Sequence, residues 1–193
     1  MQLDKAKEIA QGVLDHLKPY AEIIHIGGSI RRQKPEVKDI EIIMLPKFVV
    51  VNEQGSLFGE SEKTEKVHPE ILTVLNNAGK ILKGNIEGRY MQIDLSQGIK
   101  LDLFMPQKHD YYRILAIRTG SSSFANYKIA WGWKKKGWVG TSDGLRLNSE
   151  CVQKSGGTYE CKEQEPTLPP EWKSEEEFFN WLGLEWAEPK LRT

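Results

Sequence analysis

The stretch Gly27-Gly28-Ser29-Ile30-Arg31-Arg32 is followed, a few residues later, by the run Asp39-Ile40-Glu41-Ile42-Ile43-Met44-Leu45. Paired glycines let the backbone approach an anion closely, Ser29 adds a hydroxyl group, and the two arginines add forked cationic donors. The first stretch therefore predicts a phosphate-binding turn, and a triphosphate is its natural guest.

The second stretch predicts a buried strand, because it is apolar and β-branched and is closed by Pro46. Alternation along a strand places Asp39, Glu41 and Ile43 on one face. Two acids on a mostly buried face are unfavourable unless a positive group lies between them, and Mg²⁺ is commonly held by one or two carboxylates plus substrate phosphates. The two stretches together predict a nucleotidyl transfer site. The alternative is an edge strand whose two acids face solvent.

These residues resemble a known family. Gly28-Ser29-Ile30-Arg31-Arg32 with Lys38-Asp39-Ile40-Glu41 is similar to the nucleotidyltransferase superfamily, and most of all to the family X, DNA polymerase beta-like, DNA polymerases. Lys100-Leu101-Asp102 matches the family's basic-x-Asp pattern, which carries a third carboxylate. Tyr111-Tyr112 and Arg118-Thr119-Gly120-Ser121 match its Tyr-Tyr helix and Thr-Gly-Ser turn, and residues 178–190 resemble the end of its thumb.

The resemblance implies an α+β fold in two domains. Residues 1–106 would form a nucleotidyltransferase-type palm, a mixed sheet with helices on one face. Residues 107–193 would form a small α+β thumb that contacts nucleotide and nucleic acid. All six tryptophans lie after residue 130, which indicates a separate core for the second domain. No other domain precedes the first helix, so a minimal palm-plus-thumb layout is expected.

The resemblance also implies a mechanism. A primer 3′-hydroxyl would attack the α-phosphate of a nucleoside triphosphate and release pyrophosphate, with two Mg²⁺ ions, or Mn²⁺ as a substitute, clamping the attacking and leaving oxygens. Asp39 and Glu41 would hold both ions, and Asp102 would bind the catalytic ion and accept the hydroxyl proton. The other implied nucleotide-binding residues are Gly28, Ser29, Arg32, Lys38, Thr119, Gly120, Ser121 and Asn126.

Two of these assignments, those of Asp102 and Asn126, need a closer look at the sequence. Asp94 is a second candidate for the third carboxylate, but Asp102 is favoured because Lys100 precedes it as in the family. Asp102 is expected on a strand that lies beside Asp39. Asn126 would read the minor-groove edge of the nascent pair, although the register slips by one residue before it.

The chain departs from the family at two places. Glu41 stands where family X polymerases usually have Asp, and Ile117-Arg118 stands where repair polymerases often carry two aromatic residues. These departures leave the sugar preference and the acceptor open. Gap-filling or repair synthesis on gapped DNA or a primer-template is the leading expectation. The alternatives are nucleotide transfer to a small molecule, a protein or an RNA end, and an inactive nucleic-acid-binding module.

Composition adds few constraints. The 193 residues contain 27 basic and 27 acidic side chains, so any grip on phosphate must be local. No stretch is apolar enough for a membrane helix, and the N-terminus lacks a signal-peptide core, so a cytoplasmic protein is expected. A monomer is expected because the pattern of residues indicates no large exposed apolar helix face. Cys151 and Cys161 could face each other across a hairpin, but cytosolic cysteines are expected to be free thiols.

The pattern of residues also predicts individual elements. Helices are expected over residues 4–18, capped by Asp4, from Pro69 to a C′ Gly79, and over 107–117 and 122–136, with a last helix that opens on a Ser174/Glu177 capping box. Strands are expected over 23–26, 80–83, 89–95 and 99–104, with a hairpin over 48–58 that turns at residues 52–55 and another that turns at Ser142-Asp143-Gly144. Trp131, Trp133, Trp138 and Lys134 to Lys136 are either a basic-aromatic DNA patch or, as favoured here, core tryptophans beside a solvated helix end.

Overall fold

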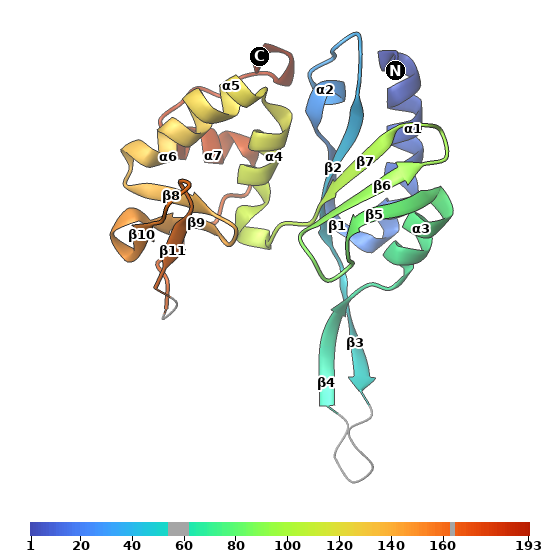
Figure 1. Cartoon of the computed structure of the whole chain (residues 1–193), viewed down its shortest axis with the longest axis horizontal. Helices are drawn as coiled ribbons and strands as arrows, with labels where there is room; N and C mark the ends of the chain where they lie inside the picture. The colour runs from blue at the N-terminus through green and yellow to red at the C-terminus, as the bar shows by residue number, and fades with distance from the viewer. Residues whose placement is uncertain (54–61, 163–164) are drawn as a thin grey trace. The chain divides into compact units, whose positions relative to one another are not determined.

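The computed structural model describes residues 1–53, 62–162 and 165–193 (Figure 1). The chain divides after Pro106 into two compact units, Met1–Pro106 and Gln107–Thr193. Each unit mixes helices and strands, so the fold is α+β.

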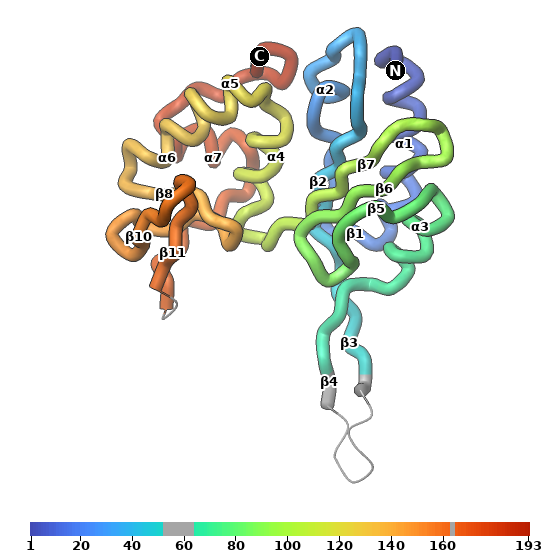
Figure 2. Tube along the Cα trace, in the orientation of Figure 1, coloured from blue at the N-terminus to red at the C-terminus, as the bar shows by residue number. Residues whose placement is uncertain are grey.

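The first unit is built on a five-stranded mixed sheet of order β1-β2-β7-β6-β5. The parallel pair is β2 with β7, and the other neighbours are antiparallel. Figure 2 shows β2 and β7 side by side although they are far apart in the sequence. The strands are β1 Ala21–Ile26, β2 Asp39–Pro46, β5 Gly79–Gly84, β6 Tyr90–Leu95 and β7 Lys100–Phe104.

Helices α1 (Leu3–Leu17) and α3 (Glu70–Ala78) pack on one face of this sheet (Figure 1). The strands turn their alternate apolar residues toward these helices, among them Ile40, Ile42, Leu101 and Leu103, all fully buried. Because side chains alternate across a strand, the acids between these residues point to the other face of the sheet.

Both helices differ from the expectation at one end. Helix α1 begins at Leu3 with Gln2 as its N-cap, so Asp4 lies inside the first turn, where an acid still interacts favourably with the helix dipole. Gly79 has an extended φ of 175° and opens β5 directly, so it is not a left-handed C′ residue. A Cβ at Gly79 would lie 2.2 Å from the Asp94 carbonyl oxygen, so a glycine is needed here because the backbones of β5 and β6 approach closely.

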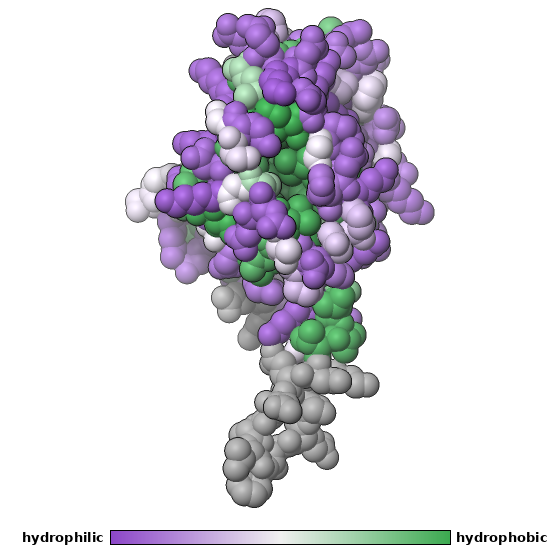
Figure 3. Space-filling view, turned by 90° about the vertical axis from the view of Figure 1, so that its right-hand side faces the viewer, coloured by the Kyte–Doolittle hydropathy of each residue, from purple (hydrophilic) through white to green (hydrophobic). Residues whose placement is uncertain are grey.

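A separate antiparallel hairpin is formed by β3 (Phe48–Glu53) and β4 (Glu62–Val67). The strand pairing of this hairpin continues through Asn52 and Glu53, so the turn expected at residues 52–55 is wrong at these two positions. Residues 54 and 55 of the expected turn lie outside the described residues. Phe48 and Val50 are 53% and 61% exposed, and Figure 3 shows apolar surface at the hairpin's base.

The second unit has its own aromatic core. Trp133, Trp172, Phe178 and Phe179 are buried there, and Trp138 and Trp181 pack against them. The elements are α4 Tyr111–Thr119, α5 Ser122–Phe124, a π-helical segment Ala125–Ala130, α6 Trp131–Lys135, β8 Trp138–Thr141, β9 Gly144–Leu147, β10 Cys151–Gln153, β11 Tyr159–Cys161 and α7 Glu175–Leu182. A 3₁₀ turn, Lys108–Asp110, precedes α4. The β8–β9 hairpin turns where Ser142-Asp143-Gly144 predicts it.

The helix expected over 122–136 is not a regular α-helix throughout. Its middle, Ala125–Ala130, is π-helical and lies between the short helices α5 and α6.

Helix α7 begins as its capping box predicts. Ser174 Oγ accepts a hydrogen bond from the Glu177 N–H at 3.2 Å. The Glu177 carboxylate accepts a bond from the N–H of Lys173, one residue earlier than in the standard box.

The C-terminal tail closes this unit through a buried ion pair. Arg192 donates from Nη1 and Nη2 to Glu175 at 2.6 and 2.8 Å and from Nε to the Ala187 carbonyl at 2.8 Å. Both charged side chains are at least 95% buried.

Cys151 and Cys161 form a disulfide between directly opposed positions of β10 and β11, so the expectation of free thiols is wrong. The hairpin register brings the two residues together, and register cannot be read from spacing alone.

Candidate active site

The glycine turn rests on the second acid of β2. Helix α2 (Gly28–Arg31) begins at Gly28, whose φ is +61°. A Cβ at this position would lie 2.1 Å from Glu41 Oε2, and the neighbouring Gly27 N–H donates to the Glu41 carbonyl at 2.8 Å. Only glycine can adopt this left-handed conformation and also allow so close an approach, so the turn packs directly against the Glu41 carboxylate.

Three of the nucleotide-binding residues expected from the sequence, Ser29, Arg32 and Lys38, line one cavity of about 640 Å³. Its other charged lining residues are Lys34, Glu36 and Asp39. The Ser29 Oγ atom is shielded from solvent and, within the described residues, has no hydrogen-bond partner. Three cationic side chains and two acidic ones line this cavity, and the cationic groups with the Ser29 hydroxyl are the donors that an anionic guest would use.

Strand register brings the third carboxylate opposite Glu41. In the parallel β2–β7 pair, Glu41 is the partner of Asp102, and Asp39 is the partner of Lys100. Asp39, Glu41 and Asp102 are each partly exposed and share the face of the sheet opposite α1 and α3. The strand that carries Asp102 therefore lies beside Asp39, as expected, and Lys100 is the residue of that strand paired with Asp39.

Two side chains that the sequence reasoning missed hold Asp102. The Tyr90 hydroxyl and the Gln92 amide donate to Asp102 Oδ1 at 2.7 and 2.8 Å. Gln92 is the register partner of Asp102 on β6, and the Tyr90 ring packs against Phe104 at 5.2 Å between ring centres. Both bonds reach the same carboxylate oxygen of Asp102. The alternation of side chains along residues 90–94 indicates that Tyr90 and Gln92 share one face of a strand. It does not show that they contact Asp102 until the register between the two strands is known.

Asp94, the competing third carboxylate, lies in a different position. It is exposed and is the register partner of Lys100, so Lys100 lies between Asp94 and Asp39. The register therefore favours Asp102 over Asp94 as the neighbour of Glu41.

Carboxylate oxygens on adjacent strands are the donor type that Mg²⁺ prefers. Within residues 1–53, 62–162 and 165–193, the structure gathers no three His, Cys, Asp or Glu side chains closely enough to hold a metal ion. Glu41 and Asp102 are directly opposed across the two strands, and Asp39 lies two residues before Glu41 on β2.

The other expected site residues belong to the second unit. Thr119 is fully buried, and a Cβ at Gly120 would lie 2.8 Å from Phe124 Cδ1. Ser121 caps α5, because its Oγ accepts from the Phe124 N–H at 3.1 Å, and its own N–H donates to the Arg192 carbonyl at 2.9 Å. The Thr-Gly-Ser turn is thus held firmly, and its serine hydroxyl has a structural role.

Asn126 is exposed on the π-helical segment, so its side chain can be reached from solvent.

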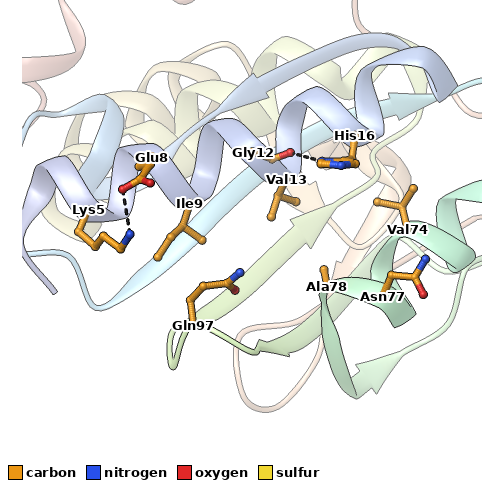
Figure 4. A pocket seen from close by; sticks show the side chains of 10 residues that line it. All are labelled: Lys5, Glu8, Ile9, Gly12, Val13, His16, Val74, Asn77, Ala78 and Gln97. Carbon is orange, nitrogen blue, oxygen red and sulfur yellow. Dashed lines mark hydrogen bonds and ion pairs between the residues drawn. The ribbon is translucent and has the colours of Figure 1, made fainter.

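A second cavity, of about 440 Å³, lies between α1 and α3 (Figure 4). Some of its polar side chains pair with each other or with backbone: Lys5 pairs with Glu8 at 2.9 Å, and His16 Nδ1 lies 2.7 Å from the Gly12 carbonyl. None of the expected site residues lines this cavity.

Among the helices that the structure describes, none combines the length and the apolar character needed to cross a membrane.

No curated protein matches the chain significantly. A family model does match part of it, over residues 114–193, which lie in the second unit. That model is the DNA polymerase beta thumb, and the match supports a family X polymerase-like relationship for this chain.

Proposed function

We propose that this chain is a metal-dependent nucleotidyltransferase, most specifically a minimal family X DNA polymerase that adds a deoxynucleotide to a primer 3′-hydroxyl and releases pyrophosphate. The observation that carries the proposal is the seating of the Gly28 turn on Glu41, with Asp102 directly opposite Glu41 on the parallel strand. A phosphate-binding turn and two acids are thereby joined in one place.

The residues that line the cavity would bind the phosphates of the nucleotide. Ser29 Oγ, Arg32 and Lys38 would bind the β- and γ-phosphates, since all three line the cavity and two carry positive charge. Gly28 would keep the backbone close to these phosphates. This part of the site binds and orients the nucleotide.

Asp39, Glu41 and Asp102 would hold two Mg²⁺ ions, which supply Lewis-acid stabilisation of the attacking and leaving oxygens. Tyr90 and Gln92 fix Asp102 through Oδ1, so its Oδ2 can face the primer hydroxyl and accept the proton. The thumb match implies DNA binding, which favours a DNA acceptor over a small molecule.

The discriminating experiment offers the protein a labelled triphosphate and Mg²⁺ with gapped DNA, primer-template, single strands, RNA, or no polynucleotide. Template-dependent extension of gapped DNA by the wild type and by Glu41→Asp, but not by Glu41→Gln, supports the proposal. Turnover without a polynucleotide would assign the chain to small-molecule or protein nucleotidyl transfer instead. If no triphosphate binds and no acceptor is modified, the chain is a binding module.

A further inference from the structure

Two large aromatic side chains lie open to solvent on the second unit. Tyr127 is 77% exposed on the π-helical segment, and Trp131 is 56% exposed at the start of α6. Trp131 is the most exposed of the six tryptophans. Tyr127 and Trp131 are about one helical turn apart and therefore lie near each other on the surface.

The core does not explain this exposure. The same helical stretch packs inward through Ile129 and Trp133, which are buried, and Gly132, which approaches Leu182. Tyr127 and Trp131 occupy the outward positions between these residues. Large aromatic groups on a surface indicate an interaction site.

The surroundings of the two rings are positively charged. Lys135 Nζ lies 5.7 Å from the centre of the Trp131 ring, and Lys128 and Lys134 are exposed on the same stretch. From Ser121 to Thr141 the sequence contains no acidic residue, although the whole chain has equal numbers of acids and bases. We call Tyr127, Trp131 and Lys135, with Lys128 and Lys134, the aromatic ridge.

We propose that the aromatic ridge binds an unpaired DNA strand, with Tyr127 and Trp131 stacking on successive bases and the lysines binding phosphates. Aromatic faces beside cationic side chains are the standard means of binding single strands without sequence preference. Duplex DNA hides its base faces, so lysines alone would serve a duplex. The expected view of Trp131 as a core residue is wrong, whereas Trp133 and Trp138 do belong to the core and its border.

This inference deepens the proposed function, and it rests on that function in naming DNA as the partner. Its test requires neither metal nor triphosphate, so failure of strand binding and failure of nucleotidyl transfer are distinguishable.

The test compares fluorescence anisotropy of a labelled oligothymidine with that of an abasic oligonucleotide of equal length. Both probes carry the same phosphates, and only the first carries bases. We expect the wild type to bind oligothymidine more tightly. Tyr127→Ala with Trp131→Ala should remove this preference, weakening oligothymidine binding roughly 5- to 150-fold for each stacking interaction removed.

Two variants serve as controls, and a third tests the lysines of the aromatic ridge. Tyr127→Phe with Trp131→Phe keeps two aromatic faces and should retain the preference for bases. Phe48→Ala removes an exposed aromatic group from the first unit and should change nothing. Lys135→Ala should lower the salt dependence of binding, by about 0.7 in the logarithmic slope for each phosphate that is no longer neutralised.

Several results would overturn the inference. One is equal affinity of the wild type for the two oligonucleotides, and another is an unchanged preference in the double alanine variant. A third is that the double alanine variant loses as much affinity for the abasic strand, for polyglutamate or for vesicles of anionic lipid as it loses for oligothymidine. That result would identify a general polyanion-binding surface. Unchanged far-ultraviolet circular dichroism shows that the variants are folded.

Discussion

At the scale of single residues, Gly28 combines a left-handed backbone conformation with a close approach to the Glu41 carboxylate. Its φ is +61°, and an added Cβ would lie 2.1 Å from Glu41 Oε2. Gly98 has a similar φ of +75° but has open space around it. Alanine substitutions at Gly28 and Gly98 would therefore share the cost of backbone strain, but only the one at Gly28 would also displace the Glu41 carboxylate.

We predict that Gly98→Ala lowers the free energy of unfolding by about 1–3 kcal/mol and leaves nucleotidyl transfer intact, because it introduces only strain. Gly28→Ala should be less stable still and should reduce activity by about 100-fold or more, since Glu41 must move. Circular dichroism melts and transfer rates check both. Equal activity of the two variants would contradict the role of Gly28.

The Tyr90 hydroxyl donates a hydrogen bond to Asp102 in the candidate site. Tyr90→Phe removes the donor to Asp102 Oδ1 but keeps the ring packing against Phe104. We predict that Mg²⁺ affinity falls by about 10- to 100-fold, the usual effect of removing a partner of a metal ligand. Calorimetric titration with Mg²⁺ measures it. Tyr20→Phe, which alters a tyrosine beside His68, is the matched control and should bind Mg²⁺ normally.

The strand positions of the candidate site residues differ in how far the sequence predicts them. Asp39 and Glu41 follow from strand alternation, because their positions depend on one strand only. Tyr90 and Gln92 depend on the register between β6 and β7, which neighbouring residues in the sequence do not specify.

At the scale of elements, the packing of α4 against α7 places Tyr112 near an acidic helix end. Burial raises the pKa of Tyr112 above its ordinary value of 10.0, and the charges of Glu176, Glu177 and Glu175 raise it further. A raised pKa means that the folded state favours the protonated phenol. The stability that results is complete below the unfolded pKa near 10 and is lost as the pH rises through the folded pKa.

We therefore predict that the free energy of unfolding falls more steeply above about pH 10 in the wild type than in Tyr112→Phe, which has no phenol to ionise. Denaturant titrations followed by tryptophan fluorescence measure this, because all six tryptophans lie in the second unit. Parallel pH profiles for the two proteins would show that Tyr112 contributes nothing.

Element types follow from sequence more readily than element ends. Periodicity predicts α1, α3 and the central strands, but Gln2 and Gly79 take backbone roles that local propensity did not indicate. The π-helical segment and the Cys151–Cys161 disulfide depend on tertiary packing and on hairpin register, and neither leaves a periodic signal.

At the scale of the whole molecule, the last residues complete the second unit. Arg192 is fully buried and forms two bonds with Glu175, and its carbonyl accepts a hydrogen bond from the N–H of Ser121. The Thr-Gly-Ser turn is thereby tied to the end of the chain. The aromatic composition of residues 130–193 predicted a separate core, but this ion pair could not be foreseen from spacing.

We predict that Arg192→Met lowers the free energy of unfolding of the second unit by about 3–5 kcal/mol, because Glu175 would remain buried without its partner. Denaturant unfolding followed by tryptophan fluorescence measures the change. Lys190→Met breaks an exposed pair with Glu188 and should leave stability unchanged. A small effect of Arg192→Met would mean that Glu175 is readily neutralised or hydrated.

In the proposed function, Asp102 completes a carboxylate site for nucleotidyl transfer opposite Glu41. Its most direct test is the rate of Mg²⁺-dependent nucleotide incorporation into gapped DNA by the wild type, Asp102→Asn and Asp94→Asn. We predict that Asp102→Asn abolishes incorporation, whereas Asp94→Asn, altered at an exposed position beside Lys100, retains it. Undiminished incorporation by Asp102→Asn, or a loss of activity confined to Asp94→Asn, would contradict the proposed role of Asp102.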